Sequence, residues 1–355
     1  MSSAIFSSPS HFSQAFNEGL VEMLNHDSLG TLILGCANAT FDPFIFEATH
    51  SVLRAQFKKL EKHFLDNFRQ GRQVNESDED LLVFLKMLVV GFDELAQTTF
   101  RDEGDWEIQF NQVRAFRPRR MSGQVAGGIH APFNENGFHF NKPFMQKECF
   151  WEGELNGRAA ALFYNKYPFI DYHGLLVPER QKSLPQFLHE EYHRYIWQLA
   201  EQLGENLPGL GFGYNSCGAH ASVNHLHFQM FLRPRGLPVM AEHWRHNGGE
   251  KAYPAQCERL NDCSQAWSYI DNLHQVQIPY NLIYLPEEIL IFPRKHQSDY
   301  RQAEWSGGFS WYEMGGGTIT FNRQAYDELD AEELVDEFAK LRLQPKAYVA
   351  APAQG

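Results

Sequence analysis

The stretch SVNHLHFQMFLRP, residues 222–234, most constrains the fold of this chain because apolar and polar residues alternate along it. The apolar members are Leu226, Phe228, Met230 and Leu232. Successive side chains of a β-strand point to opposite faces, so residues two apart share one face. The alternation therefore predicts a strand with one face on a hydrophobic core. His225, His227 and Gln229 then form a polar row on the other face.

Three explanations fit such a row. The first is a polar face whose groups are all satisfied. The second is a metal site, since two histidines can bind iron, zinc or copper, usually with a third ligand that is often a carboxylate. Residues 228–240 contain no Asp, Glu or Cys, although a ligand from elsewhere in the chain keeps this explanation open. We expect no metal.

The third explanation is nucleophilic catalysis on phosphorus, in which a neutral imidazole attacks a phosphate and splits one difficult displacement into two. This chemistry needs a fixed imidazole tautomer and donors for the developing charge. His225 or a backbone carbonyl could fix the ring of His227, and the neutral amide of Gln229 could donate to a phosphoryl oxygen. The preceding loop, YNSCGAHASVN, adds backbone amides and four polar side chains suited to phosphate oxygens: Asn215, Ser216, Ser222 and Asn224.

Composition limits the partners of the chain. It has 355 residues, 43% of them hydrophobic, and a net charge of −13, which argues against general nucleic-acid binding. The five Cys include no CxxC pair, which is typical of reduced cytosolic thiols. The N-terminus lacks the features of a signal peptide, and the most apolar run, residues 81–92, is too short to span a membrane. We expect a soluble cytoplasmic protein without a membrane partner.

An acidic protein that handles phosphate must concentrate positive charge locally. The stretch RAFRPRR contains four arginines, among them Arg114 and Arg119, and FHFNK adds Asn141 and Lys142. Guanidinium groups can bind a phosphate through two hydrogen bonds, so these residues are candidates for capturing the second phosphate group. A solvated cluster at a strand end is the alternative.

The pattern of secondary structure changes along the chain. Residues 11–100 have helical spacing, with Ser77 as a candidate N-cap. Short aromatic and β-branched segments from about residue 105 predict strands, including WEIQFNQVRAF, FHFNKPF, RAAALFYNKYPF and HGLLVPE. Residues 188–204 predict an amphipathic helix that ends at Gly204.

A weak internal repeat suggests a duplication. Residues 162–183 are similar to residues 278–298, since both run from Tyr-Asn through a turn to an apolar strand and then a basic segment. The alternative is chance similarity. The sequence predicts four parts in chain order: a helical region over 1–103, a catalytic half over 104–240, a degenerate half over 241–345 and a tail over 346–355.

With NHLHFQ preceded by GYNS, the chain resembles the histidine triad superfamily. It is most similar to the branch with Gln at the last triad position, which includes galactose-1-phosphate uridylyltransferase and the GDP-L-galactose/GDP-glucose phosphorylases. The similarity runs over residues 105–345. It implies an α+β fold in which helices pack on an antiparallel sheet, with two half-domains, the second degenerate, and extra helices at the N-terminus.

The resemblance also implies roles for individual residues. His227 takes the position of the nucleophile, His225 the supporting position and Gln229 that of the phosphate-contacting glutamine. His173 lies where the superfamily has its Gly-His strand, although Tyr172 stands in place of the usual Gly. Asn165 opens this stretch and is a candidate for ribose or phosphate contact.

The implied activity is the cleavage of a nucleoside diphosphate hexose by inorganic phosphate through a nucleotidyl-His227 intermediate, with a GDP-hexose as the expected substrate. No metal or other cofactor is implied, and the chain is expected to be a monomer or homodimer. A phosphorylase or hydrolase of dinucleoside polyphosphates (Ap4A) would use the same nucleophile. A nucleotide-binding sensor without catalysis is the alternative from another class.

Overall fold

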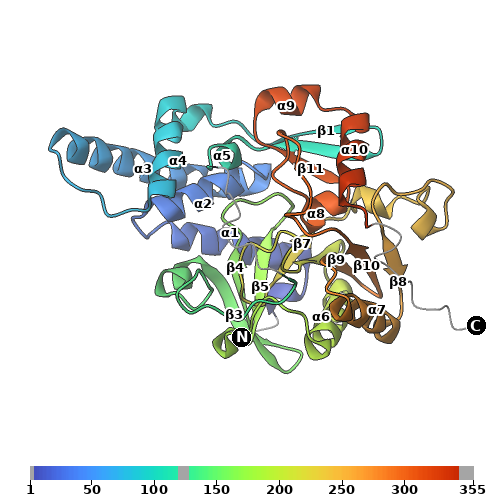
Figure 1. Ribbon diagram of the computed structural model, residues 1–355. Helices are drawn as coiled ribbons and strands as arrows, with labels where there is room; N and C mark the ends of the chain where they lie inside the picture. The colour runs from blue at the N-terminus through green and yellow to red at the C-terminus, as the bar shows by residue number, and fades with distance from the viewer. Residues whose placement is uncertain (1–3, 119–127, 344–355) are drawn as a thin grey trace, which may run out of the picture.

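The N-terminal part of the protein is helical, as its sequence spacing predicts. The computed structural model describes residues 4–118 and 128–343. Its first four helices are α1 (Pro9–Met23), α2 (Leu29–Ala39), α3 (Pro43–Arg69) and α4 (Asp78–Val90). The predicted N-cap is confirmed, because the Ser77 hydroxyl accepts a hydrogen bond from the Asp80 backbone N–H at 3.1 Å. In Figure 1, α3 extends outward from the body of the molecule.

The centre of the molecule is an eight-stranded antiparallel sheet in the order β3-β4-β5-β7-β6-β9-β10-β8. Its strands are β3 (Cys149–Leu155), β4 (Arg158–Tyr164), β5 (Gly174–Pro178), β6 (Leu210–Asn215), β7 (Phe228–Leu232), β8 (Glu258–Leu260), β9 (Tyr280–Leu285) and β10 (Glu288–Pro293). With the packing helices, this sheet confirms the predicted α+β class.

A second sheet has three strands, β1 (Thr99–Glu103), β2 (Trp106–Phe110) and β11 (Gly317–Thr320). β1 and β2 form an antiparallel hairpin, and β11 pairs with β2 in parallel. This sheet joins two segments that are about two hundred residues apart in the chain.

Of the remaining helices, α6 (Glu190–Gly204), α7 (Cys263–Gln275) and α8 (Trp311–Met314) pack on strands of the central sheet, and α9 (Arg323–Glu328) packs on the three-stranded sheet. In Figure 1, α6 and α7 lie together on one side. The other helices are α5 (Gln112–Ala115) and α10 (Ala331–Leu341). No helix in the described ranges is long and apolar enough to cross a membrane.

The predicted alternation around β7 is confirmed. The four apolar residues at positions 226, 228, 230 and 232 belong to one large core, which also contains residues of α1–α4, α6 and α7. The intervening side chains point to the other face, where Phe231 stacks on Trp311 with 5.1 Å between ring centroids. Trp311 belongs to a second core, built with the three-stranded sheet and α10.

The strand itself begins later than the sequence predicts. β7 starts at Phe228, so His225 and His227 lie in the segment that leads into it. Leu226 N–H donates to the Leu184 carbonyl at 2.8 Å, and His227 N–H donates to the Gln186 side chain at 2.9 Å. The backbone here is therefore bound by residues 184–186 and not by a neighbouring strand.

Two other predicted strands are wrong in part. After β2, residues 112–115 form the short helix α5, because the Asn111 side chain accepts a hydrogen bond from Arg114 N–H at 2.8 Å and caps the turn. The stretch FHFNKPF forms a loop that leads into a 3₁₀ helix, Pro143–Glu148. The proline lies in its first turn, where no backbone N–H is needed.

The division into two halves remains a prediction. The two similar stretches both contain paired neighbouring strands, β4 with β5 and β9 with β10. The central sheet continues across the predicted boundary, since β6 pairs with β9. β1, from the predicted helical region, and β11, from the predicted second half, lie in the same small sheet.

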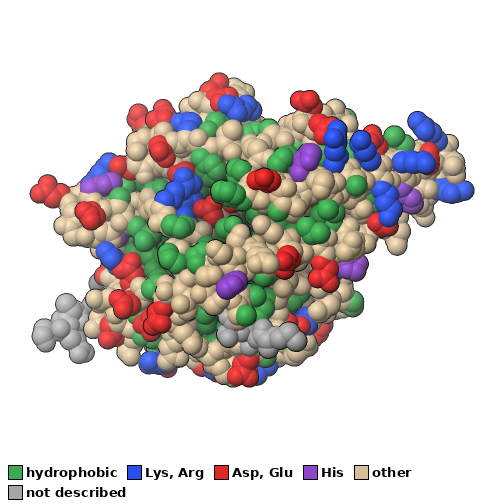
Figure 2. Space-filling model, turned by 180° about the vertical axis from the view of Figure 1, so that it is seen from behind, with side chains coloured by type: hydrophobic (Ala, Val, Ile, Leu, Met, Phe, Trp, Pro, Cys, Tyr) green, Lys and Arg blue, Asp and Glu red, His purple; other side chains and the backbone are tan. Residues whose placement is uncertain are grey.

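Charged side chains are mixed over much of the surface. Figure 2 shows acidic and basic groups interspersed on the rear face, with Lys and Arg gathered on the projecting arm formed by α3. Lys58, Lys62 and Arg69 on this helix are exposed. The net charge of −13 is thus unevenly distributed, and this arm is locally basic.

Candidate active site

His227 is held by the side chain of Gln186. The Gln186 oxygen accepts from His227 N–H at 2.9 Å, and its NH2 group donates to the carbonyls of His227 at 3.2 Å and Asn215 at 3.0 Å. Gln186 is 1% exposed, so these bonds are protected from water. One amide therefore fixes the backbone that carries the predicted nucleophile and ties it to the end of β6. Gln186 is not among the site residues that the sequence predicts.

The ring of His227 has a defined tautomer. Its Nδ1 lies 2.8 Å from the His225 carbonyl oxygen, which can only accept a hydrogen bond. The proton of the neutral ring must therefore be on Nδ1, and Nε2 carries the lone pair. Nε2 makes no hydrogen bond to any described residue. The sequence left open whether His225 or a backbone carbonyl fixes this ring, and the structure places a carbonyl there.

The ring of His227 is neutral at physiological pH. Burial lowers its pKa to about 4 because it disfavours the imidazolium, while the hydrogen bond to the His225 carbonyl opposes the shift. The ring also packs on Phe140, with 5.3 Å between centroids. An uncharged imidazole with a free nitrogen has the form that a nucleophile requires.

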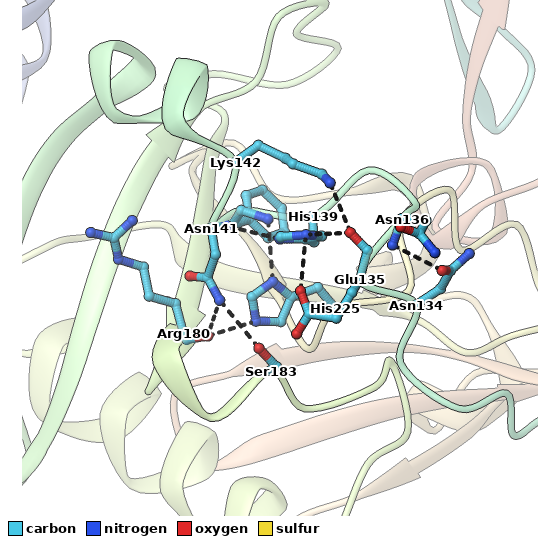
Figure 3. A network of polar contacts seen from close by, with 10 residues as sticks. Asn134, Glu135, Asn136, His139, Asn141, Lys142, Arg180, Ser183 and His225 are labelled. Atoms are coloured by element: carbon cyan, nitrogen blue, oxygen red, sulfur yellow. Dashed lines mark hydrogen bonds and ion pairs between the residues drawn. The ribbon is translucent and has the colours of Figure 1, made fainter.

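His225 has the opposite tautomer and connects two loops. Its Nδ1 accepts from Phe140 N–H at 3.2 Å, and its Nε2–H donates to the Arg180 carbonyl at 3.1 Å. Burial, with the nearby His227 ring, lowers its pKa to about 4. Figure 3 shows this ring at the centre of a polar network. The predicted supporting role thus has a physical basis, because His225 presents its carbonyl to His227 and is itself fixed on both sides.

Gln229 contacts His173 across the sheet. His173 Nε2 lies 2.9 Å from Gln229 Oε1 and 3.2 Å from the Asn165 NH2 group, while Asn165 Oδ1 accepts from Tyr167 N–H. His173 Nδ1 is buried without a partner, so a proton there would be an unsatisfied donor. The proton therefore belongs on Nε2, which donates to Gln229; the Asn165 NH2 group can also only donate, so it contacts this nitrogen without forming a hydrogen bond to it. The Gln229 NH2 group remains available as a donor.

His173 is neutral as well. It is fully buried, which lowers its pKa to about 3 despite the hydrogen bond to Gln229, and the nearby Arg114 charge acts in the same direction. Its ring packs edge-on against Phe169, with 4.3 Å between centroids. His173 and Asn165 thus lie beside Gln229.

The four predicted polar loop residues differ in whether their side chains are already hydrogen-bonded within the protein. Asn215 accepts from Trp311 N–H at 2.8 Å and from Asn281 at 2.7 Å. The Ser216 hydroxyl accepts from Tyr280 N–H on β9 at 2.9 Å and donates to the Cys217 carbonyl at 3.2 Å, and Asn224 ties residues 131–132 to Gln186. Their predicted phosphate contacts would compete with these bonds. Ser222 is exposed, which leaves its hydroxyl accessible.

Asn141 and Lys142 lie near His225, as Figure 3 shows. Asn141 donates to the Arg180 carbonyl at 2.8 Å, and its Oδ1 is buried without a partner. Lys142 donates to the Glu135 carbonyl at 2.8 Å. The structure brings both residues to the loop that surrounds the supporting histidine.

Arg114 reaches the other side of the site. Its guanidinium donates to the Tyr167 carbonyl and lies over the Phe169 ring at 5.0 Å, and Phe169 in turn contacts His173. Burial lowers its pKa to about 10, which still leaves it charged at neutral pH. Its Nε has no hydrogen-bond partner. The predicted site residue Arg119 lies outside the described residues.

No group of three or more His, Cys, Asp or Glu side chains suited to a metal occurs in residues 4–118 and 128–343. Besides Gln186, two aromatic residues of the site were not predicted from the sequence. Phe169 and Trp311 pack around His173, with 4.3 and 6.4 Å between ring centroids. The sequence signal that could have pointed to Gln186 is the position of this polar residue in the apolar stretch LPQFL, residues 184–188.

Comparison with known proteins gives a match over part of the chain. Residues 99–231 match the family model described as "GDPGP1-like, N-terminal domain". GDP-D-glucose phosphorylase 1 of Danio rerio is 31% identical over 153 residues, which cover 41% of this chain and 42% of the relative. GDP-L-galactose phosphorylase 2 of Arabidopsis thaliana is 26% identical over 200 residues, covering 47% and 46%. The chain thus matches less than half the length of these relatives.

Among solved structures, yeast Ap4A phosphorylase Apa2 aligns with 76% of this chain and 97% of its own, with a TM-score of 0.49 and 14% identity. Its complex with Ap4A aligns with a TM-score of 0.47. The resemblance to the GDP-hexose phosphorylase branch that the sequence motif indicates is confirmed by the family match, which includes the His225–Gln229 motif.

Proposed function

We propose that this protein is a nucleotidyltransferase that cleaves a GDP-hexose with inorganic phosphate, through a guanylyl group carried on His227. The observation that carries the proposal is the ring of His227, whose proton is held on Nδ1 by the His225 carbonyl at 2.8 Å. This leaves an unprotonated Nε2 on a neutral imidazole. The names of the curated relatives, which act on GDP-D-glucose and GDP-L-galactose, support the choice of substrate.

In the first step, the Nε2 lone pair of His227 forms a bond to the α-phosphorus. The bond from that phosphorus to the bridging oxygen breaks, and hexose 1-phosphate leaves with the electron pair. The ring gains positive charge while its Nδ1–H remains bound to the His225 carbonyl, which stabilises this charge. No proton has to move for the step to occur.

The negative charge on the phosphoryl oxygens needs donors. The NH2 group of Gln229 is free because His173 binds the Oε1 atom of the same amide at 2.9 Å. Arg114 supplies a buried positive charge beside His173. An amide and a guanidinium keep their protonation state across the physiological pH range, so they donate without titrating.

In the second step, an oxygen of inorganic phosphate attacks the same phosphorus on the face opposite His227. The bond between phosphorus and Nε2 breaks, the electron pair returns to the ring, and GDP is released. Two displacements at one phosphorus regenerate the neutral histidine, which is the logic of covalent catalysis.

The proposal also covers the cellular location, oligomeric state and partners of the enzyme. We infer a cytoplasmic monomer or homodimer that binds a nucleoside diphosphate sugar and phosphate and does not bind nucleic acid. The net charge of −13 supports the last point. Asn165, Asn141, Lys142 and Ser222 are proposed to contact the substrate.

The test is a product assay with and without phosphate, using GDP-glucose, GDP-galactose, UDP-glucose and Ap4A as separate donors. The proposal predicts phosphate-dependent release of GDP and hexose 1-phosphate, which His227→Ala abolishes. His26→Ala, which removes an exposed imidazole, is the matched control and should retain activity. Turnover of Ap4A alone would support the dinucleoside polyphosphate alternative, and nucleotide binding without turnover would support the sensor.

A further inference from the structure

Tyr172, the residue before His173, has an unusual backbone conformation. Its φ is +49°, in the left-handed region that glycine adopts easily and that other residues adopt at a cost. A bulky aromatic residue in this region persists only where its surroundings hold it. The contacts of its side chain therefore bear on how His173 is placed.

The side chain of Tyr172 is held by helix α1. Its hydroxyl lies 2.7 Å from the Ser13 hydroxyl, which is hydrogen-bond distance. The rings of Phe16 and Phe12 pack edge-on against it, with 5.4 and 6.1 Å between centroids. All three partners come from one face of α1, so this helix forms an anchor for a single residue of the site loop.

Helix α1 is itself fixed to the strand beside β5. The Tyr164 hydroxyl on β4 donates to the Phe16 carbonyl at 2.6 Å, and the two rings lie 4.8 Å apart. Tyr164 pairs with Gly174, the first residue of β5. The anchor and the strand that follows His173 thus belong to one packed unit.

A second N-terminal helix holds the other end of the same loop. Asn38 on α2 donates to the Asn165 carbonyl at 3.1 Å and to the Leu34 carbonyl at 2.9 Å. Asn165 then faces His173 Nε2 at 3.2 Å. The loop from 165 to 173 is therefore bound at both ends by helices that precede the part of the chain matched by the family model.

We propose that Tyr172 is a positioning residue, and that its anchorage on α1 maintains a left-handed backbone that sets the ring of His173 and, through it, the amide of Gln229. The extra N-terminal helices thereby become part of the active-site architecture. The catalytic consequence rests on the proposed function, whereas the conformational claim does not.

The decisive comparison is Tyr172→Gly against Tyr172→Ala. Both substitutions remove the same ring and hydroxyl, but only glycine tolerates a positive φ. We expect kcat of the Ala variant to be about tenfold below that of the Gly variant, because the left-handed penalty for a non-glycine residue corresponds to a factor of about ten. KM should differ less than about twofold, since the Gln229 donor acts on charge that develops in the transition state.

The role of α1 is tested by removing the hydroxyl pair. Ser13→Ala and Tyr172→Phe should each lower kcat modestly, and the double variant should be no worse than either single variant. Ser13→Ala should have no effect on kcat in the Tyr172→Gly background, where no anchor is needed. Additive losses in that background would overturn the proposed role of α1.

A readout without substrate separates this proposal from the proposed function. The ¹⁵N-labelled His173 ring, assigned with a His173→Asn variant, should keep its Nε2–H signal in Tyr172→Gly and shift in Tyr172→Ala. If the wild-type enzyme turns over no nucleotide but this pattern holds, the proposed function fails and the positioning claim stands. Equal His173 spectra in the Gly and Ala variants, or equal kcat values in folded protein, would overturn the positioning claim.

Discussion

Replacing Gln186 with methionine should both destabilise the protein and remove activity. Methionine has nearly the same length and volume but cannot form a hydrogen bond of comparable strength. Gln186 is 1% exposed and satisfies three backbone groups: the N–H of His227 and the carbonyls of His227 and Asn215. Residues 184–186 stand where a neighbouring strand would otherwise bind this segment.

The expected cost follows from these contacts. A buried polar group left without its partner costs about 1–3 kcal/mol, and three such groups that relax together should cost about 3–5 kcal/mol in the free energy of unfolding. The loss of activity should be larger than stability alone explains, because the backbone of His227 is no longer fixed relative to β6. Misplacing a nucleophile by about 1 Å can cost about a hundredfold in rate.

The assay is urea unfolding followed by fluorescence, combined with kcat measured well below the unfolding midpoint. Gln198→Met is the matched control, since Gln198 lies exposed on α6 and should change neither quantity by a measurable amount. If Gln186→Met lowers the free energy of unfolding by less than about 1 kcal/mol and leaves kcat normal, the proposed role of Gln186 in fixing the backbone of His227 is refuted.

Four further predictions concern the site and its support. Gln229→Glu replaces the free NH2 donor with a negative charge and should lower kcat about 10²–10³-fold with little change in KM, measured in steady-state phosphorolysis. Because burial lowers the pKa of His227 to about 4, the single-turnover rate should stay level as pH falls from about 8 to 6 and decline only as pH falls toward 4; half-loss near the ordinary value of 6.5 would contradict this. The free energy of unfolding should change with pH in the same direction as the rate. His227 binds a proton more readily in the unfolded chain than in the folded one, so the free energy of unfolding should fall as pH drops from about 6.5 toward 4 in urea titrations. Arg233→Met should lower the free energy of unfolding by about 3–5 kcal/mol in the same titrations, because it removes the buried partner of Glu107 at 2.6 Å. The Glu107 carboxylate would then keep only the half-exposed Arg235 and the Tyr312 hydroxyl.

Much of the site follows from local pattern. The alternation at 222–234 predicts which side chains enter the core and which face the site, because this depends only on the two-residue period of extended backbone. The same period cannot say where hydrogen bonding to a neighbouring strand begins. That depends on residues 184–186, which are some forty positions away and replace the strand partner of His227.

The partners of the proposed catalytic residues His225, His227 and Gln229 were harder to predict because they come from distant segments. A backbone carbonyl fixing His227 was one of two open alternatives, and only the fold selects it. The assignment of Asn215 to phosphate contact did not foresee that its side chain binds Trp311 and Asn281. A short polar side chain in a glycine-containing loop suits a ligand and a structural bond equally well, and local sequence does not distinguish them.

The position of Tyr172 illustrates a different limit. The sequence has a tyrosine where the resemblance leads to the expectation of a glycine. In the structure Tyr172 has a left-handed backbone and is held by α1, a helix about 150 residues earlier in the chain. The compensation could not be predicted because it depends on tertiary packing between segments that share no local pattern.

The most direct test of the covalent mechanism is intact-protein mass spectrometry after incubation with a GDP-hexose in the absence of phosphate. The proposed covalent mechanism predicts a mass increase of one guanylyl group, which added phosphate removes with release of GDP. The adduct should be absent in His227→Ala and present in the His26→Ala control. Phosphate-dependent turnover with no adduct on rapid quenching, or an adduct that persists in His227→Ala, would contradict the assignment of His227 as the nucleophile.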